Sequence, residues 1–312
     1  MPSSSPEPTR SPGRALGYRL FGGSFDYLLH LRPAEWPIMA GHTALGMILA
    51  VGWSGVSRTD LSPLLLGLTL WVVCLNGGTL AINSAFDRDT EDVAYLRAPP
   101  APPRYLFVFG LSLMAVGLAG AMLLPAGYLA AYSLCLVLSV LYSVPPVRLK
   151  AVAGADWFIN LWGFGALTPY AGWAATGRPV TPAGVAILVG FGALFASFYP
   201  LTQLYQLEAD RARGDRTLAT VLGVERSLDL ALGCGIVAFA LFGLGGVRAG
   251  WLELVVPLRW GGLAAAAAVW LGGLLWWRRV GARLSAAAHQ RRMYLALAAW
   301  AAVDLAILAG FA

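Results

Sequence analysis

The fold of this chain is decided by the stretch Asn83-Ser84-Ala85-Phe86-Asp87-Arg88-Asp89-Thr90-Glu91-Asp92, which ends an apolar run that begins near residue 64. Four acidic residues occur in its last six positions, where a hydrophobic segment would leave a membrane. On a helix with 100° per residue, Asn83, Asp87 and Glu91 fall within roughly 80° of one another and share one face. Such oxygen-only clusters suit a hard cation such as Mg²⁺ with a phosphate ligand. The alternative is a solvated acidic loop.

The composition indicates a polytopic membrane protein. Of the 312 residues, 58% are hydrophobic and only 12% are charged, and the mean hydropathy is +0.67. Ordinary soluble domains carry about 25% charged residues. The net charge of +6 therefore reflects membrane topology rather than a nucleic-acid surface. Cys74, Cys135 and Cys234 lie inside apolar runs without the spacing of metal ligands or disulfides, so we expect them to be packing residues.

The hydrophobic pattern predicts an all-α fold, a bundle of nine transmembrane helices. Most of the apolar segments approach the roughly 20 residues that span a bilayer. Residues 1–16 are rich in Ser, Pro and Arg and are predicted to be a disordered tail, and residues 17–312 form one transmembrane domain that begins with an interfacial segment at 17–33. The nine segments are 36–53, 64–83, 105–124, 127–142, 157–175, 183–204, 228–247, 260–277 and 293–311.

The positions of lysine and arginine predict the orientation. Eighteen of the 22 basic residues precede the first segment or lie in the connections after the second, fourth, sixth and eighth. The other side carries only Arg58, Arg178, Arg248 and Arg259. By the positive-inside rule, the N-terminus and the acidic stretch are cytoplasmic and the C-terminus is outside, in an integral protein of a bacterial-type inner membrane. The partition also favours an odd number of spans.

A second acidic cluster, Gln203-Leu204-Tyr205-Gln206-Leu207-Glu208-Ala209-Asp210-Arg211, follows the sixth segment on the same side. On a helix, Gln206 and Asp210 are about 40° apart, whereas Glu208 lies about 200° round from Gln206. Arginines follow at once. Carboxylates that hold a divalent metal and guanidinium groups that hold an oxyanion are the chemistry of a metal–diphosphate site.

Between the two clusters lies a cytoplasmic loop, Tyr142-Ser143-Val144-Pro145-Pro146-Val147-Arg148-Leu149-Lys150. Its Pro-Pro pair cannot continue a helix, so the chain turns there and presents Arg148 together with Lys150, the only lysine of the chain. Taken alone, this loop could be an ordinary positively charged cytoplasmic connection. Three loops of complementary chemistry on one side are more specific than any one of them.

With these motifs the chain resembles the UbiA superfamily of intramembrane prenyltransferases, from about residue 31 onwards. That family has nine transmembrane helices and an NDxxDxxxD-type motif after the second. Asn83, Asp87 and Glu91 fall on this motif, with Ser84 in place of its first Asp and Glu91 in place of its last.

The other two motifs of the family also have counterparts. Gln206 and Asp210 fall on the DxxxD-type motif after the sixth helix, with Gln206 in place of the first Asp. The YSxPPxRLK-like loop after the fourth helix matches Tyr142, Ser143, Pro145, Pro146, Arg148 and Lys150.

The resemblance implies a helical bundle around a central apolar cavity, in which Mg²⁺ and a prenyl diphosphate bind at the cytoplasmic mouth. A prenyl group then passes to a lipophilic acceptor within the bilayer. The implied catalytic residues are Asp87, Asp210, Arg148 and Lys150; the implied binding residues are Asn83, Arg88, Tyr142, Gln206 and Arg211; and the implied metal ligands are Asn83, Asp87, Glu91, Gln206 and Asp210.

Several alternatives remain open at the level of sequence. The acceptor could be an aromatic ring, a quinone precursor, a carotenoid end or a glycerol lipid. If the prenyl diphosphate lost its diphosphate but no acceptor captured the resulting cation, the protein would be a terpene cyclase. A third alternative is a non-catalytic quinone-binding, lipid-binding or transport protein. Asn76, about two turns before Asn83, either lines the same cavity or forms hydrogen bonds between helices.

Overall fold

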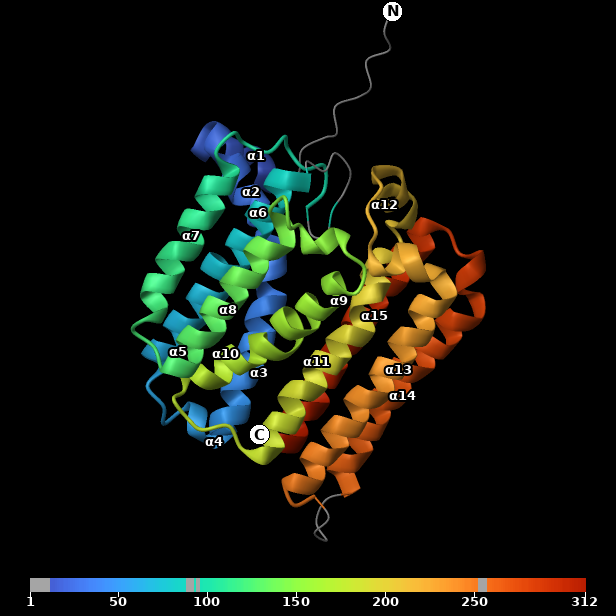
Figure 1. Cartoon of the computed structure of the whole chain (residues 1–312). Coiled ribbons are helices and arrows are strands. Elements are labelled where there is room, and N and C mark those ends of the chain that lie inside the picture. Colours follow the sequence, from blue (N-terminus) through green and yellow to red (C-terminus); the bar gives the residue numbers. More distant parts are fainter. Residues whose placement is uncertain (1–11, 88–92, 94–95, 252–256) are drawn as a thin grey trace, which may run out of the picture.

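The computed structural model describes residues 12–87, 93, 96–251 and 257–312, and within these ranges the chain is a bundle of helices without a β-strand. Figure 1 shows the long helices running side by side, with α1 (Pro12–Phe21), α2 (Phe25–His30) and α12 (Leu207–Arg213) at one end of the bundle and the C-terminus at the other. The all-α prediction is confirmed for the described chain.

Each apolar segment predicted from the sequence lies in a helical stretch of the described residues. Six stretches are long and apolar enough to cross a membrane: Leu61–Asp87, Ala126–Ser143, Pro182–Gln203, Leu218–Arg248, Leu258–Arg283 and Ala286–Phe311. The elements that cover the predicted segments are α3 (Trp36–Val51), α5 (Leu61–Thr69), η3 (Leu70–Gly77), α6 (Gly78–Asp87), α7 (Leu106–Ala121), α8 (Ala126–Ser143), α9 (Ala155–Asn160), η5 (Leu161–Leu167), α10 (Thr168–Ala175), α11 (Pro182–Gln203), α13 (Leu218–Arg248), α14 (Pro257–Val280) and α15 (Ala286–Phe311).

Three boundaries differ from the sequence prediction. Helix α1 begins at Pro12, inside the predicted 1–16 tail, while residues 1–11 lie outside the described ranges. The sixth segment ends at Gln203, so the second acidic cluster occupies a separate helix, α12. The seventh is preceded by a short helical stretch from Leu218, which the Thr217 side chain caps by accepting a hydrogen bond from the backbone N–H of Thr220, and a kink at Gly223 (φ 72°, ψ 176°) separates this stretch from the long helix.

Two helices contain π-helical turns where they border the interior. These turns, η3 and η5, interrupt the second and fifth predicted segments. In a π-helical turn each backbone bond spans five residues, so the winding is wider, and such turns are frequent at functional sites. The sequence carries no proline or polar pattern that marks η3.

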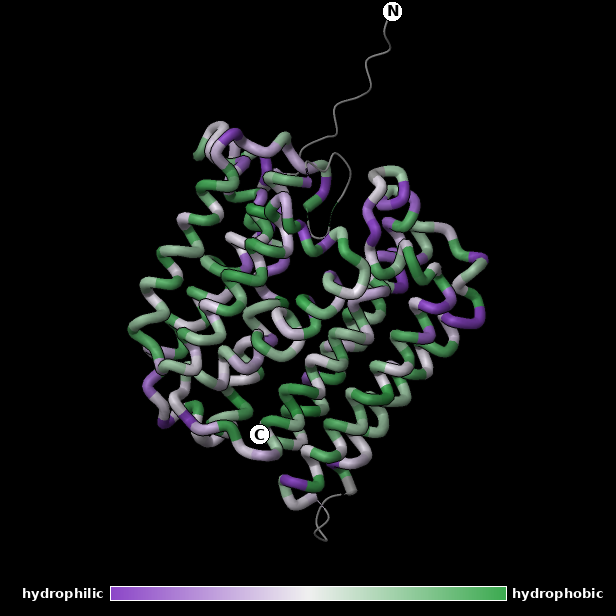
Figure 2. Tube along the Cα trace, viewed as in Figure 1, coloured by the Kyte–Doolittle hydropathy of each residue, from purple (hydrophilic) through white to green (hydrophobic). Residues whose placement is uncertain are grey.

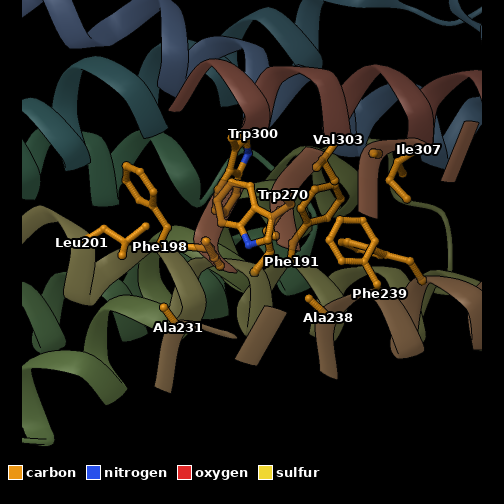
Figure 3. Close-up of a cluster of buried hydrophobic side chains, with 14 of the residues drawn as sticks. Phe191, Phe198, Leu201, Ala231, Ala238, Phe239, Trp270, Trp300, Val303 and Ile307 are labelled. Atoms are coloured by element: carbon orange, nitrogen blue, oxygen red, sulfur yellow. The ribbon is translucent and has the colours of Figure 1, made fainter. Parts of the chain in front are cut away.

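The buried side chains form two main clusters, one in each half of the bundle. Elements η3, α7, α8 and α10 supply most of one. The other is contributed largely by α11, α13, α14 and α15, where Phe191, Phe198, Trp270 and Trp300 pack together (Figure 3). Trp270 also donates a hydrogen bond through Nε1 to Ser197 Oγ, at 3.0 Å. Figure 2 shows that hydrophilic residues gather at the ends of the helices, including the end that carries α12.

Helices α3 and α10 approach closely because glycines lie at their crossing. A Cβ atom on Gly46 would lie 1.7 Å from the carbonyl oxygen of Pro169, and one on Gly172 would lie 1.8 Å from that of Thr43. Small residues at helix crossings let backbones pack tightly within membranes. This crossing fixes α3, whose first turn borders the cavity described next.

Candidate active site

A cavity of about 930 Å³ opens between the two halves of the bundle. Its walls come from α3, η3, α6, α8, η5, α11, α12 and α15. Apolar and aromatic side chains such as Trp71, Phe164 and Phe198 line part of it, and both acidic clusters contribute polar groups. This placement joins segments more than 100 residues apart in the sequence.

The predicted first cluster and the predicted basic loop meet on one wall of this cavity. Lys150 Nζ donates hydrogen bonds to Asn83 Oδ1, at 2.7 Å, and to Asp87 Oδ1. Arg148 Nη2 lies 3.3 Å from Asp87 Oδ1, and its Nη1 lies 2.7 Å from Asp215 Oδ1. Arg148 therefore connects the first cluster to the segment that follows the second. Arg88 and Glu91 lie outside the described residues.

The chain reaches this arrangement through a sharp turn after α8. Pro145 and Pro146 follow the end of the helix, and Arg148 N donates to Val144 O at 3.0 Å. Arg148 itself adopts a left-handed backbone conformation (φ 36°), which directs the following short helix η4 (Leu149–Ala151) back toward α6. The loop thus presents Lys150 to the cavity and places Arg148 against Asp87 and Asp215, two acids that line it.

The second cluster reaches the same cavity through α12. Asp210 is buried and lines the cavity, and it accepts a hydrogen bond from Thr217 Oγ1 at 3.5 Å. Gln206, just before the first residue of α12, also lines the cavity, and its Nε2 donates to Tyr205 Oη at 3.1 Å. Glu208 is exposed and does not line the cavity, in agreement with the helix geometry.

One predicted binding residue lies apart from the others. Arg211 is exposed and is not among the residues that line the cavity. It occupies the solvent side of α12, since the helix turns by 100° from the buried Asp210. The structure thus does not bring Arg211 to the site.

Asp156 is a buried carboxylate that the sequence analysis missed, and it holds together helices next to the cavity. Asp156 has no exposed surface, and its Oδ2 accepts hydrogen bonds from Gln203 Nε2 at 2.8 Å and from Leu218 N at 3.0 Å. Gln203 Oε1 accepts a hydrogen bond from Ala219 N at 3.0 Å. Asp156 and Gln203 therefore join α9, α11 and the start of α13. The only sequence signal was an acid at the start of an apolar segment.

The network continues to the predicted binding residue Tyr142. Its hydroxyl lies 3.0 Å from that of Tyr199, which accepts a second hydrogen bond from Gln203 Nε2 at 3.2 Å. Both tyrosines line the cavity. The network holds their hydroxyl groups in place on the wall between the two clusters.

The donor groups fit a magnesium ion that shares its ligands with a diphosphate. Within the described ranges, no three His, Cys, Asp or Glu side chains are close enough to hold a metal by themselves. However, Asn83, Asp87, Gln206 and Asp210 present amide and carboxylate groups to one cavity, and the Lys150 ammonium contacts oxygens of two of them. Mg²⁺ is commonly held by one or two carboxylates, waters and substrate phosphates, which this set allows.

Comparison with known proteins agrees with this geometry. The sequence pattern of the UbiA prenyltransferase family matches residues 36–303. The chain belongs to this family. The match includes both acidic clusters and the basic loop of this UbiA-family protein.

Two relatives and one solved structure show how far the likeness extends. The protein is 31% identical to the lycopene elongase/hydratase of Halobacterium salinarum over 267 residues, 81% of this chain and 91% of that protein. It is 30% identical to the digeranylgeranylglyceryl phosphate synthase of Natronomonas pharaonis over 72% of this chain and 80% of that protein. A UbiA homologue from Archaeoglobus fulgidus, bound to DMAPP and Mg²⁺, has the same fold, with a TM-score of 0.66 at 21% identity, over 90% of this chain and 99% of that one.

Proposed function

We propose that this protein is a Mg²⁺-dependent prenyltransferase that moves a prenyl group from a prenyl diphosphate to a lipophilic acceptor within the membrane. The observation that carries the proposal is the meeting of Asn83, Asp87, Lys150 and Asp210 on a largely apolar cavity, with Arg148 in contact with Asp87. The UbiA homologue of Archaeoglobus fulgidus was solved with DMAPP and Mg²⁺, which agrees with this pairing of ligands.

The polar end of the cavity would bind the diphosphate. Asn83, Asp87, Gln206 and Asp210 would hold Mg²⁺, which neutralises diphosphate charge and so weakens the allylic C–O bond; Glu91, whose structure is not described, is a further proposed ligand. Arg148 and Lys150 would leave their acidic partners to donate hydrogen bonds to the departing diphosphate. Arg88 remains a proposed binding residue, whereas Arg211 lies on the solvent side of α12.

The apolar part of the cavity would hold the prenyl chain and protect the reactive carbon from water. Phe164, Phe195 and Phe198 line this part, and their ring faces stabilise a nearby positive charge. Tyr142, held by Tyr199, would border the reacting end. Because the cation forms in a dry, aromatic pocket, it would persist until the acceptor reaches it.

For the acceptor we propose a linear polyene of the lycopene type. The similarity to proteins named lycopene elongase/hydratase extends over most of both chains and supports this choice. Such an acceptor has no ionised group, so it can occupy the lipid-facing region of an apolar cavity without a second cationic site.

We also propose nine membrane spans around the cavity, in one domain formed by residues 17–312, after a tail at 1–16. The active site would face the cytoplasm of a bacterial-type inner membrane, with the C-terminus outside. This topology is supported by the distribution of 18 basic residues on one side and four on the other.

Purified full-length protein in lipid nanodiscs tests the function. Incubation with dimethylallyl diphosphate, Mg²⁺ and lycopene should give a lycopene product heavier by one prenyl unit, measured by mass spectrometry. A cyclised product formed from a longer donor without an acceptor would instead identify a terpene cyclase. Complete absence of donor consumption with dimethylallyl, geranyl and geranylgeranyl diphosphate would refute an enzymatic role.

A further inference from the structure

A second polar site lies on the cavity wall, built from residues that the diphosphate site does not use. Glu35 ends the short helix η2 (Pro33–Glu35) just before α3, is only 9% exposed and lines the cavity. It forms no ion pair with any residue in the described ranges. Buried carboxyl groups are rare unless they are paired or have a chemical role.

Asn76 lies beside Glu35 on the same wall. It lines the cavity from η3 and is only 4% exposed. Its amide interacts with the Glu35 carboxyl and acts to lower the pKa of that carboxyl, but neither amide atom makes a hydrogen bond of standard geometry to a described residue. An amide buried without well-formed hydrogen bonds costs free energy, so a ligand that supplies a polar group here would be favoured.

The site lies deeper in the bundle than the predicted metal ligands. Asn76, Asn83 and Asp87 all line the cavity along one helical stretch. At 1.5 Å per residue, Asn76 is roughly 10 Å further along the helix than Asn83. A chain anchored by its diphosphate beside Asn83 would therefore extend toward Glu35 and Asn76.

The surroundings of Glu35 suit proton exchange near neutral pH. Burial raises the pKa of the Glu35 carboxyl to about 7, although the neighbouring Arg32 and the Asn76 amide both act in the opposite direction. Arg32 itself is buried and donates a hydrogen bond through Nη2 to Ser84 Oγ at 3.4 Å. A carboxyl group that changes charge near the working pH can accept and release a proton in each turnover.

We propose that Glu35, assisted by Asn76, accepts the proton that is released when the prenyl cation is captured. This inference rests on the proposed prenyl transfer. The allylic C1–O bond breaks and its electron pair leaves with the diphosphate. The electron pair of an acceptor double bond, or a lone pair of water, forms the new bond to C1. The proton lost by the acceptor carbon beside the new cation, or by the attacking water, passes to a carboxylate oxygen of Glu35.

The test separates ionisation from capture by using full-length protein in nanodiscs with dimethylallyl diphosphate labelled with ¹⁸O at the bridging position. Movement of the label to non-bridging positions shows that the C1–O bond broke and that the diphosphate then recombined with the cation. Capture is the sum of prenylated lycopene and dimethylallyl alcohol, and parallel reactions in H₂¹⁸O identify products formed with water.

For Glu35→Gln we expect capture to fall by about 100-fold, a typical effect of losing a general base. Label movement should stay within twofold of wild type, because ionisation does not use Glu35. Glu35→Asp should restore part of the capture. The matched control is Glu225→Gln on the exposed surface of α13, which should leave both rates unchanged.

Two outcomes would overturn the inference. Capture within twofold of wild type in Glu35→Gln would show that Glu35 takes no proton. Equal loss of label movement and capture would place Glu35 in donor binding or in folding. Failure of the proposed function looks different, because wild type itself would then show neither Mg²⁺-dependent label movement nor capture.

Discussion

Replacing Lys150 by Met tests the centre of the proposed mechanism. The Lys150 side chain is 11% exposed and that of its partner Asp87 is 16% exposed, so water screens their contact only weakly. A hydrogen bond involving a charged group contributes about 1.5–3 kcal/mol and a neutral one about 1 kcal/mol. The Lys150 ammonium is charged in both of its hydrogen bonds, to the Asp87 carboxylate and to the amide oxygen of Asn83, which gives about 3–6 kcal/mol for the pair.

We take these two bonds as the measure of what the ammonium offers to diphosphate oxygens. Arg148 also contacts Asp87 and would compensate in part, so we expect a loss of about 2–3 kcal/mol. At 1.36 kcal/mol per factor of ten, kcat/KM for the donor should fall about 30- to 160-fold. The assay is formation of prenylated lycopene at varied dimethylallyl diphosphate.

With Mg²⁺ alone and no donor, the same substitution should strengthen metal binding instead of weakening activity. In wild type the ammonium competes with Mg²⁺ for oxygens of Asn83 and Asp87, so Lys150→Met should be stabilised more strongly against heat by Mg²⁺ alone. The control is Arg283→Met, which removes an exposed cation from the same predicted membrane side. If kcat/KM for the donor in Lys150→Met stayed within threefold of wild type, Lys150 would contribute only to the positive charge of the cytoplasmic side, and the reasoning would be refuted.

Three further predictions follow from the site and the topology. Asp87→Asn and Asp210→Asn should each abolish turnover while the detergent-purified protein remains monodisperse, and near-normal product formation in both would contradict the metal site. Gln206→Ala should raise the Mg²⁺ concentration needed for half-maximal activity and Gln206→Asp should lower it, whereas Glu208→Ala should change it less because that side chain is exposed; the reverse ranking would show that Glu208 is the ligand. A reporter fused after Ala312 should be active only outside the cytoplasm, and cytoplasmic activity would mean that a span is miscounted.

The elements set by local patterns could be predicted from the sequence. Apolar runs located the helices, and the Pro-Pro pair predicted the turn that presents Arg148 and Lys150. The one-turn spacing of Gln206 and Asp210 also agrees with the cavity wall they share. These features depend on neighbouring residues alone, so their signals lie close together in the chain.

Features that depend on pairing across the bundle could not be predicted. Asp156 and Gln203 are 47 positions apart, and nothing in their local sequence shows that they meet. The contact of Arg148 with Asp215 spans 67 positions and is likewise not indicated by the local sequence of either residue. The break between α11 and α12, which makes the second acidic cluster begin a new helix, is also not revealed by a continuous apolar pattern.

The π-helical turn η3 determines which way the first acidic cluster faces. A π-helical turn accommodates one residue more than α-helical winding over the same length, so the segments on either side keep their relative orientation. If the same residues of Leu70–Gly77 wound as an ordinary α-helix, everything after them would be rotated by roughly 100° relative to what precedes them. Asn83 and Asp87 would then turn away from the cavity although no side chain had been altered. The winding of this mostly apolar segment thus decides whether the first acidic cluster reaches the cavity.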